Sequence, residues 1–75
     1  MYKFRLTTAT IAVMLEADGS KRALLLPNGA EVATDDPEVI RENSDGGRFI
    51  CVEWNGMTIN MFLVDLQERG ELCEG

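Results

Sequence analysis

The dipeptide Asn55-Gly56 lies between two stretches in which apolar and polar side chains alternate. Asn-Gly is a preferred pair for a two-residue type I′ turn, in which both residues take a positive φ. We therefore expect a hairpin that joins Arg48–Trp54 to Met57–Leu63, with its register set by the turn. One face then carries three apolar pairs: Trp54 with Met57, Val52 with Ile59, and Ile50 with Met61. The other face is mostly polar and ends in an aromatic pair: Glu53 with Thr58, Cys51 with Asn60, and Phe49 with Phe62.

The first fifteen residues contain a second alternation, and its parity changes part-way. The apolar side chains first occupy even positions and then odd positions: Tyr2, Phe4 and Leu6, then Ile11, Val13 and Leu15. A straight strand keeps each parity on one face, so we expect a bulge, a bend or a tight corner across residues 7–10. Such a segment serves two sides of a core, as in small barrels.

Turn signals divide the rest of the chain into short elements. Turns at residues 17–20 and 27–29 flank a strand over residues 22–26, whose leucine triplet predicts burial on both faces or a covered edge. A further strand is expected over residues 31–34.

Two short helical turns complete the expected elements. The first covers residues 35–41, with Asp36 as its cap and Pro37 in the first helical position, and a flexible loop follows over residues 43–47. The second covers residues 64–69, with Asp65 and Glu68 as a capping box and Gly70 as its end. We expect residues 74–75 to fray.

These elements predict a mainly β protein with a single domain over residues 1–75. About five strands and one or two single-turn helices fit a small SH3-like barrel or a strongly bent antiparallel sheet. An OB-like barrel and an open sheet with a docked helix are the alternatives.

Roughly the last third of the chain resembles short bacterial proteins of uncharacterised function. The resemblance rests on Val52–Gly56, Met61-Phe62 and Asp65–Gly70, with the turn Pro27-x-Gly29 in support. It implies a bacterial origin and a compact β-fold of the SH3-like small-barrel type. It implies no activity and no site residues.

The composition argues against catalysis. The chain has seven bases, thirteen acids and no histidine, for a net charge of -6. Histidine is the commonest general base and metal ligand, so its absence disfavours nucleophilic triads and zinc sites. Acid catalysis by adjacent acids such as Asp35 and Asp36 would need a carboxyl pKa raised by burial, and nothing in residues 34–37 indicates an apolar pocket. We expect a protein that is not an enzyme and has no catalytic residues, metal or cofactor.

The cysteines and the N-terminal segment favour a cytoplasmic location. Cys51 and Cys73 allow one disulfide by count, but the cytoplasm keeps thiols reduced. The apolar run after Arg5 imitates a secretory signal only crudely, because three threonines interrupt it and a poor cleavage site follows. No run approaches the roughly 18 apolar residues of a membrane span, so we expect no membrane partner.

Charge is distributed unevenly along the chain. Residues 1–30 hold four bases and two acids, a net charge of +2, whereas residues 31–75 hold three bases and eleven acids, a net charge of -8. The four bases form a candidate weak nucleic-acid patch: Lys3, Arg5, Lys21 and Arg22. The negative remainder opposes the approach of phosphates, which disfavours nucleic acid as a partner. The corresponding alternative function is a nucleic-acid-directed accessory factor, either a weak binder or an acidic mimic that blocks a nucleic-acid-binding protein.

Trp54 and Met57 are the candidate protein-interaction residues. Tryptophan beside a two-residue turn is often only partly buried and is enriched at binding hot spots. The competing interpretation is that Trp54 packs over the end of the barrel. Edge strands offer another binding route, and the uneven charge favours head-to-tail self-association. The sequence therefore predicts a non-enzymatic protein-interaction module that binds an unknown protein, or itself, through the hairpin tip or an edge strand.

Overall fold

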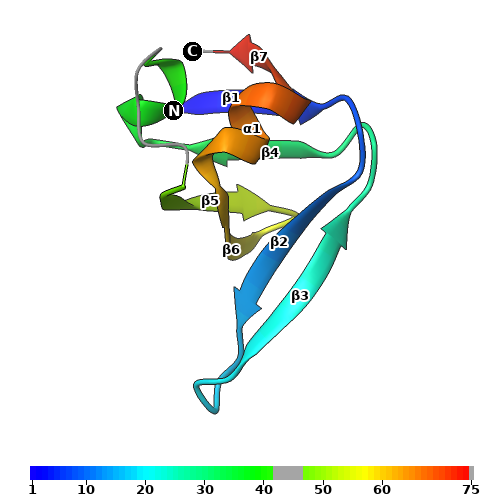
Figure 1. Cartoon of the computed structure of the whole chain (residues 1–75), viewed down its shortest axis with the longest axis vertical. Coiled ribbons are helices and arrows are strands. Elements are labelled where there is room, and N and C mark those ends of the chain that lie inside the picture. Colours follow the sequence, from blue (N-terminus) through cyan, green and yellow to red (C-terminus); the bar gives the residue numbers. More distant parts are fainter. Residues whose placement is uncertain (42–46, 75) are drawn as a thin grey trace.

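The computed structural model describes residues 1–41 and 47–74. In this part of the chain, seven antiparallel strands form one open sheet with the order β3-β2-β6-β5-β4-β1-β7 (Figure 1). The elements in chain order are β1 (Tyr2–Leu6), β2 (Thr10–Leu15), β3 (Lys21–Leu26), β4 (Glu31–Thr34), the 3-10 turn η1 (Pro37–Ile40), β5 (Phe49–Trp54), β6 (Met57–Phe62), α1 (Leu63–Arg69) and β7 (Gly70–Glu74). The predicted mainly β class is confirmed, with seven strands in place of about five.

The hairpin of β5 and β6 forms as the sequence predicts. Asn55 and Gly56 have φ values of 51° and 77°, and all six predicted cross-strand pairs are present. The inward face contributes four fully buried side chains to the core: Ile50, Val52, Ile59 and Met61. The local turn chemistry thus determines the register of the central strands.

The expected corner near residue 8 is also present. Residues 7–9 separate β1, which lies between β4 and β7, from β2, which lies between β3 and β6. The expectation that the odd positions of β2 serve the core is wrong: Ile11 and Leu15 are exposed, whereas Thr10 and Ala12 are buried. Because β2 has apolar residues on both faces, alternation could not decide which face turns inward. Burial of Thr10 is possible because its hydroxyl donates a hydrogen bond to the carbonyl of Thr8 at 3.1 Å.

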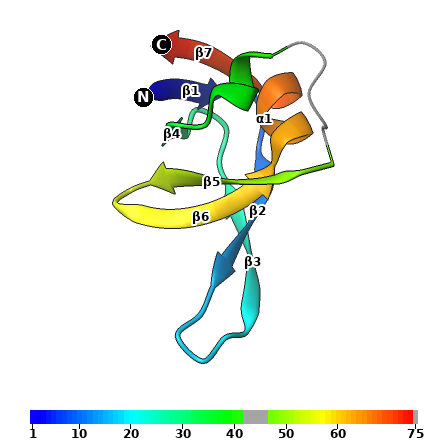
Figure 2. The ribbon, with the colours of Figure 1, turned by 90° about the vertical axis from the view of Figure 1, so that its left-hand side faces the viewer.

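Strands β2 and β3 form an arm, residues 10–26, that extends away from the other strands (Figures 1 and 2). The hydrogen bond from the N–H of Glu16 to the carbonyl of Ser20 closes its loop over residues 17–19. The loop ends in Gly19, whose φ of 89° follows the pattern of a type I turn with a left-handed third residue. The Asp18 carboxylate accepts hydrogen bonds from the hydroxyl and the backbone N–H of Ser20, and these bonds lower the pKa of Asp18.

The leucine triplet of β3 differs from the expectation. Leu26 is fully buried and Leu24 is half-buried, but Leu25 is exposed. β3 is also the terminal strand of the sheet, so its outer edge has no neighbouring strand in the described structure. Burial on both faces and a covered edge are therefore both incorrect.

The first helical turn is confirmed as η1. The Asp36 side chain caps it by accepting a hydrogen bond from the N–H of Glu38 at 3.0 Å, and Pro37 opens it. Val39 is buried, and the amide nitrogen of Gln67 in α1 donates to the carbonyl of Arg41 at 3.0 Å. The hydrogen bond from Gln67 connects the end of η1 to α1. The flexible loop expected over residues 43–47 lies outside the described residues except for Gly47.

The predicted helical turn over residues 64–69 is present as α1, but its start and the segment that follows it differ from the prediction. α1 begins at Leu63 with Phe62 as its N-cap residue and without a side-chain cap, so the expected capping box is absent. Gly70 ends the helix in an extended conformation, with a φ of -119°, and the chain continues directly into β7. β7 pairs with β1, so the fraying expected for Glu74 is wrong, because Glu74 is the last residue of a strand. Gly75, for which fraying was also expected, lies outside the described residues.

The core lies between the inward face of the bent sheet and α1. Leu66 of α1 is fully buried and packs in the same cluster as Phe4, Leu6 and Val32. No helix in the described part of the chain has the length and apolar character needed to cross a membrane.

Candidate protein-interaction surface

Trp54 and Met57 lie opposite each other at the end of the β5–β6 hairpin. Both side chains are half-buried and pack against the hydrophobic core. They project on the inward face of the sheet, together with Val52 and Ile59. The contacts of Trp54 thus match the packing interpretation.

Replacing Trp54 with alanine is expected to lower the free energy of unfolding by about 1–3 kcal/mol, because part of a large apolar contact is lost. Urea denaturation followed by circular dichroism measures the change. Thr58→Ala, an exposed substitution on the opposite face of the same hairpin, is the matched control and should change stability by less than about 0.5 kcal/mol. Equal stability of Trp54→Ala and the wild type would contradict the packing role.

The four predicted basic residues do not form one patch. Lys3 and Arg5 lie on β1, whereas Lys21 and Arg22 lie at the start of β3, near the tip of the arm (Figure 1). The molecule is 35 Å long, and the arm forms one end of it.

Acidic neighbours further reduce the basic character of these positions. The Lys3 amine lies 3.8 Å from the Glu74 carboxylate, and the Arg22 guanidinium lies 2.9 Å from that of Glu16. Arg5 is the cross-strand neighbour of Glu31 on β4 and of Glu71 on β7. This placement offers no shared surface to a nucleic-acid backbone.

The structure instead gathers apolar side chains on the outward face of the sheet. Phe49 lies opposite Phe62, and Ile11 lies opposite Leu25. Antiparallel β2 and β6 are bridged at Val13 and Asn60, and Ile11 and Phe62 stand two positions away from this bridge on the same outward face. Four neighbouring strands therefore each contribute one apolar side chain to this face, and we call these four residues the outer row: Leu25, Ile11, Phe62 and Phe49.

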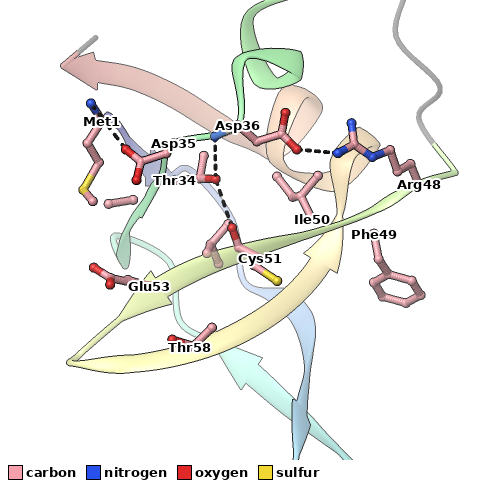
Figure 3. A pocket seen from close by; sticks show the side chains of 12 residues that line it. Met1, Thr34, Asp35, Asp36, Arg48, Phe49, Ile50, Cys51, Glu53 and Thr58 are labelled. Carbon is pink, nitrogen blue, oxygen red and sulfur yellow. Dashed lines mark hydrogen bonds and ion pairs between the residues drawn. The ribbon is translucent and has the colours of Figure 1, made fainter.

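Every residue of the outer row is exposed to solvent. The exposed fractions are 58% for Leu25, 53% for Ile11, 41% for Phe62 and 47% for Phe49. The two phenylalanine rings stack with their centroids 4.2 Å apart, and Figure 3 shows the Phe49 ring projecting away from β5. Exposed Leu15 and half-buried Val13 lie on the same face of the arm.

The outer row is long enough to be a binding surface. Four strands at a spacing of about 4.8 Å extend it over roughly 15–20 Å. Scattered exposed leucines are normal on a protein surface, but contiguous apolar patches of about 300–600 Å² are often functional. The outer row, with Val13 and Leu15 on the same face, groups such side chains on four neighbouring strands.

A groove of about 430 Å³ lies between β4 and β5 (Figure 3). The hydroxyl of Thr34 spans its floor by donating to the carbonyl of Cys51 at 2.9 Å, and the guanidinium of Arg48 is paired with Asp36. The Cys51 thiol donates to the side-chain oxygen of Asn60 at 3.1 Å. The polar groups of Thr34, Cys51, Arg48 and Asp36 are thus engaged in bonds within the protein, which suits a structural role for them.

Comparisons with protein-family models, curated sequences and solved structures give no match. Within residues 1–41 and 47–74, no group of three or more cysteine, aspartate or glutamate side chains is placed to hold a metal ion.

Sequence reasoning identified the parts of the outer row without assembling them. The pairing of Phe49 with Phe62 was predicted, and so was the strand that contains Leu25. The missing information was that β2 lies beside β6, because this neighbour relation depends on pairing between distant parts of the chain. The parity change in the first fifteen residues was the available signal, since it leaves one apolar face of β2 without a place in the core.

Proposed function

We propose that this chain is a non-enzymatic protein-interaction module that engages its partner through the outer row and the adjoining edge of β3. The observation that carries the proposal is the set of exposed apolar side chains on the neighbouring strands β3, β2, β6 and β5, on the solvent side of the sheet. Of the two binding routes expected from the sequence, this placement supports the edge strand over the hairpin tip. Trp54 and Met57 are already in contact with the core.

The edge of β3 adds backbone recognition to the apolar surface. An extended segment that pairs with an edge strand gains main-chain hydrogen bonds, and its alternate side chains lie against the neighbouring face. Leu25 belongs to both features, because it lies on the edge strand and begins the outer row. A partner strand along β3 would therefore lie next to the outer row.

The proposal also covers the type of fold and the cellular location of the protein. We propose that the strongly bent sheet is a small scaffold of the SH3-like type from a bacterial cytoplasmic protein. The steep crossing of β2 over β6 in Figure 2 supports strong bending, and the two free cysteines suit a reducing compartment.

A photo-crosslinking side chain tests the surface directly. With p-benzoylphenylalanine in place of Leu25, illumination of bacterial cells that make the protein is expected to give a discrete covalent product. The same side chain in place of Ile40 is the matched control, because Ile40 is similarly exposed, at 51%, but lies on η1. Adding Ile11→Lys to the Leu25 variant is expected to abolish the product while leaving unfolding stability within about 0.5 kcal/mol.

Two results would contradict the proposal. One is equal crosslinking from the two positions, which indicates nonspecific contact. The other is a product from the Leu25 position that persists unchanged in the Ile11→Lys variant, because the outer row then plays no part in binding.

A further inference from the structure

Among residues 1–41 and 47–74, no strand pairs with the outer edge of β3, which therefore presents unpaired backbone groups at alternate residues. The N–H of Glu16 donates to the carbonyl of Ser20 at 2.8 Å at the base of the arm loop. Backbone groups alternate in direction along an antiparallel strand, so this bond sets the pattern for the whole of β3. Arg22, Leu24 and Leu26 direct their N–H and C=O groups toward β2. Lys21, Ala23 and Leu25 direct theirs toward the open edge.

The two edges of the sheet differ in their protection against pairing. Charged side chains on an edge strand discourage association with another strand. β7 carries Glu71 and Glu74 near its two ends, and Glu74 is paired with Lys3 on β1. β3 has charges only at its start, and its sequence from Ala23 to Leu26 is entirely apolar. β3 is therefore the edge suited to pairing.

The charge and shape of the arm favour a second copy as the occupant. The arm contains Glu16, Asp18, Lys21 and Arg22, so it is neutral although the whole chain has a net charge of -6. The arm also projects from the rest of the molecule (Figure 2). Two arms lying side by side in opposite directions place the acidic parts of the two copies at opposite ends, where their repulsion is weakest. A basic partner, in contrast, would be drawn to the acidic part and away from the arm.

We propose that β3 pairs with the β3 strand of a second copy, antiparallel and around a two-fold axis that passes beside Ala23. The inference rests on the proposed function, since it names the partner of the same edge. In this register Ala23 faces the partner's Ala23, and Lys21 faces the partner's Leu25. All three outward-directed residues of each strand then take part, giving about six hydrogen bonds between the copies.

The proposed dimer has closed two-fold symmetry and a small interface, so its affinity is expected to be low. An interface with two-fold symmetry uses the same patch on both copies and does not propagate into a filament. Pairing along one short strand buries less than the about 1,200 Å² typical of stable complexes. The dimer is therefore expected to form in a concentration-dependent manner.

Engineered disulfides test the register, in a Cys51→Ser, Cys73→Ser background that removes the native thiols. Opposed residues of a hydrogen-bonded antiparallel pair have Cα atoms about 5.5 Å apart, within the about 4.4–6.8 Å that a disulfide spans. Ala23→Cys is therefore expected to give a covalent dimer under mild oxidation. Lys21→Cys is the matched control on the same strand and face, and its two copies lie about 14 Å apart along the strands.

Sedimentation tests the association without an engineered cysteine. The wild type is expected to shift from monomer toward dimer between about 10 μM and 1 mM, the range for a small, weak interface. Ala23→Lys places two like charges opposite each other at the axis and is expected to weaken the dimer by about tenfold or more. Ala17→Lys, which adds the same charge in the exposed loop of the arm, should associate like the wild type.

The outcomes separate this inference from the proposed function. A wild type that stays monomeric up to 1 mM overturns the dimer, and so does disulfide formation that is as rapid for Lys21→Cys as for Ala23→Cys. If the chain is monomeric but p-benzoylphenylalanine at position 25 still captures a different protein in an Ile11-dependent manner, the proposed function holds and only the partner changes. If position 25 captures nothing and the chain is monomeric, both fail.

Discussion

Replacing Ile59 with alanine is expected to lower the free energy of unfolding by about 2–5 kcal/mol. Ile59 is fully buried in the middle of β6, opposite Val52, and its loss leaves a cavity where the hairpin meets the core. A chain of 75 residues has a total stability of roughly 4–11 kcal/mol, so this one substitution removes a large share of it. Denaturation in urea, monitored by circular dichroism, measures the difference in midpoint.

The neighbouring position supplies the control for Ile59→Ala. Asn60→Ala changes a half-buried side chain on the outward face, which accepts a hydrogen bond from the Cys51 thiol, and is expected to cost about 1 kcal/mol or less. If the two substitutions have equal effects, the inward face of the hairpin is not the principal core surface.

The second large effect is expected for Gly70→Ala, at about 1–3 kcal/mol of lost stability. A Cβ atom at this position would lie 2.7 Å from the carbonyl oxygen of Leu66, and that oxygen also accepts the hydrogen bond from the N–H of Gly70. The contact is with backbone, so relief requires α1 and β7 to move apart. Hydrogen exchange of the β7 amides should therefore accelerate along with the loss of global stability.

Glu71→Ala provides the comparison for this substitution. Glu71 is the next residue, is exposed and lies on the same strand, so its replacement is expected to change stability by about 0.5 kcal/mol or less. A stable Gly70→Ala variant with unchanged exchange in β7 would show that the close approach of helix and strand is not required.

Elements that depend on interactions between residues close in sequence could be predicted from the sequence. Asn55-Gly56 sets the register of β5 and β6 through two adjacent positive φ values, which depend only on local chemistry. The cap of η1 is equally local, because Asp36 bonds to a residue two positions away. These elements were predicted correctly.

Features that depend on distant partners were predicted poorly. β7 has only weak strand character of its own, and it exists as a strand because β1 offers it an edge. The inward face of β2 depends likewise on which neighbours it finds, since both of its faces are apolar. A pattern read along one segment contains no information about these choices.

In the candidate site too, local features could be predicted from the sequence, whereas features that depend on distant partners could not. Trp54 and Met57 were singled out because of their residue types and their place beside a turn, yet their side chains contact the core. The outer row draws one residue from each of the strands β3, β2, β6 and β5, and β2 and β6 are neighbours in the sheet although they are far apart in the sequence. Only the assembled sheet brings these side chains onto neighbouring strands.

The position of β1 between β4 and β7 has a consequence for the kinetics of folding. Arg5 is the cross-strand neighbour of both Glu31 and Glu71. The backbone pairing of β1 is therefore complete only when segments from the middle and the far end of the sequence have reached it. Closing such long loops costs chain entropy before the contacts repay it, and sheets rich in these pairings fold on the scale of milliseconds to seconds. The β5–β6 hairpin can therefore form early in folding, whereas the pairing of β1 with β7 forms later.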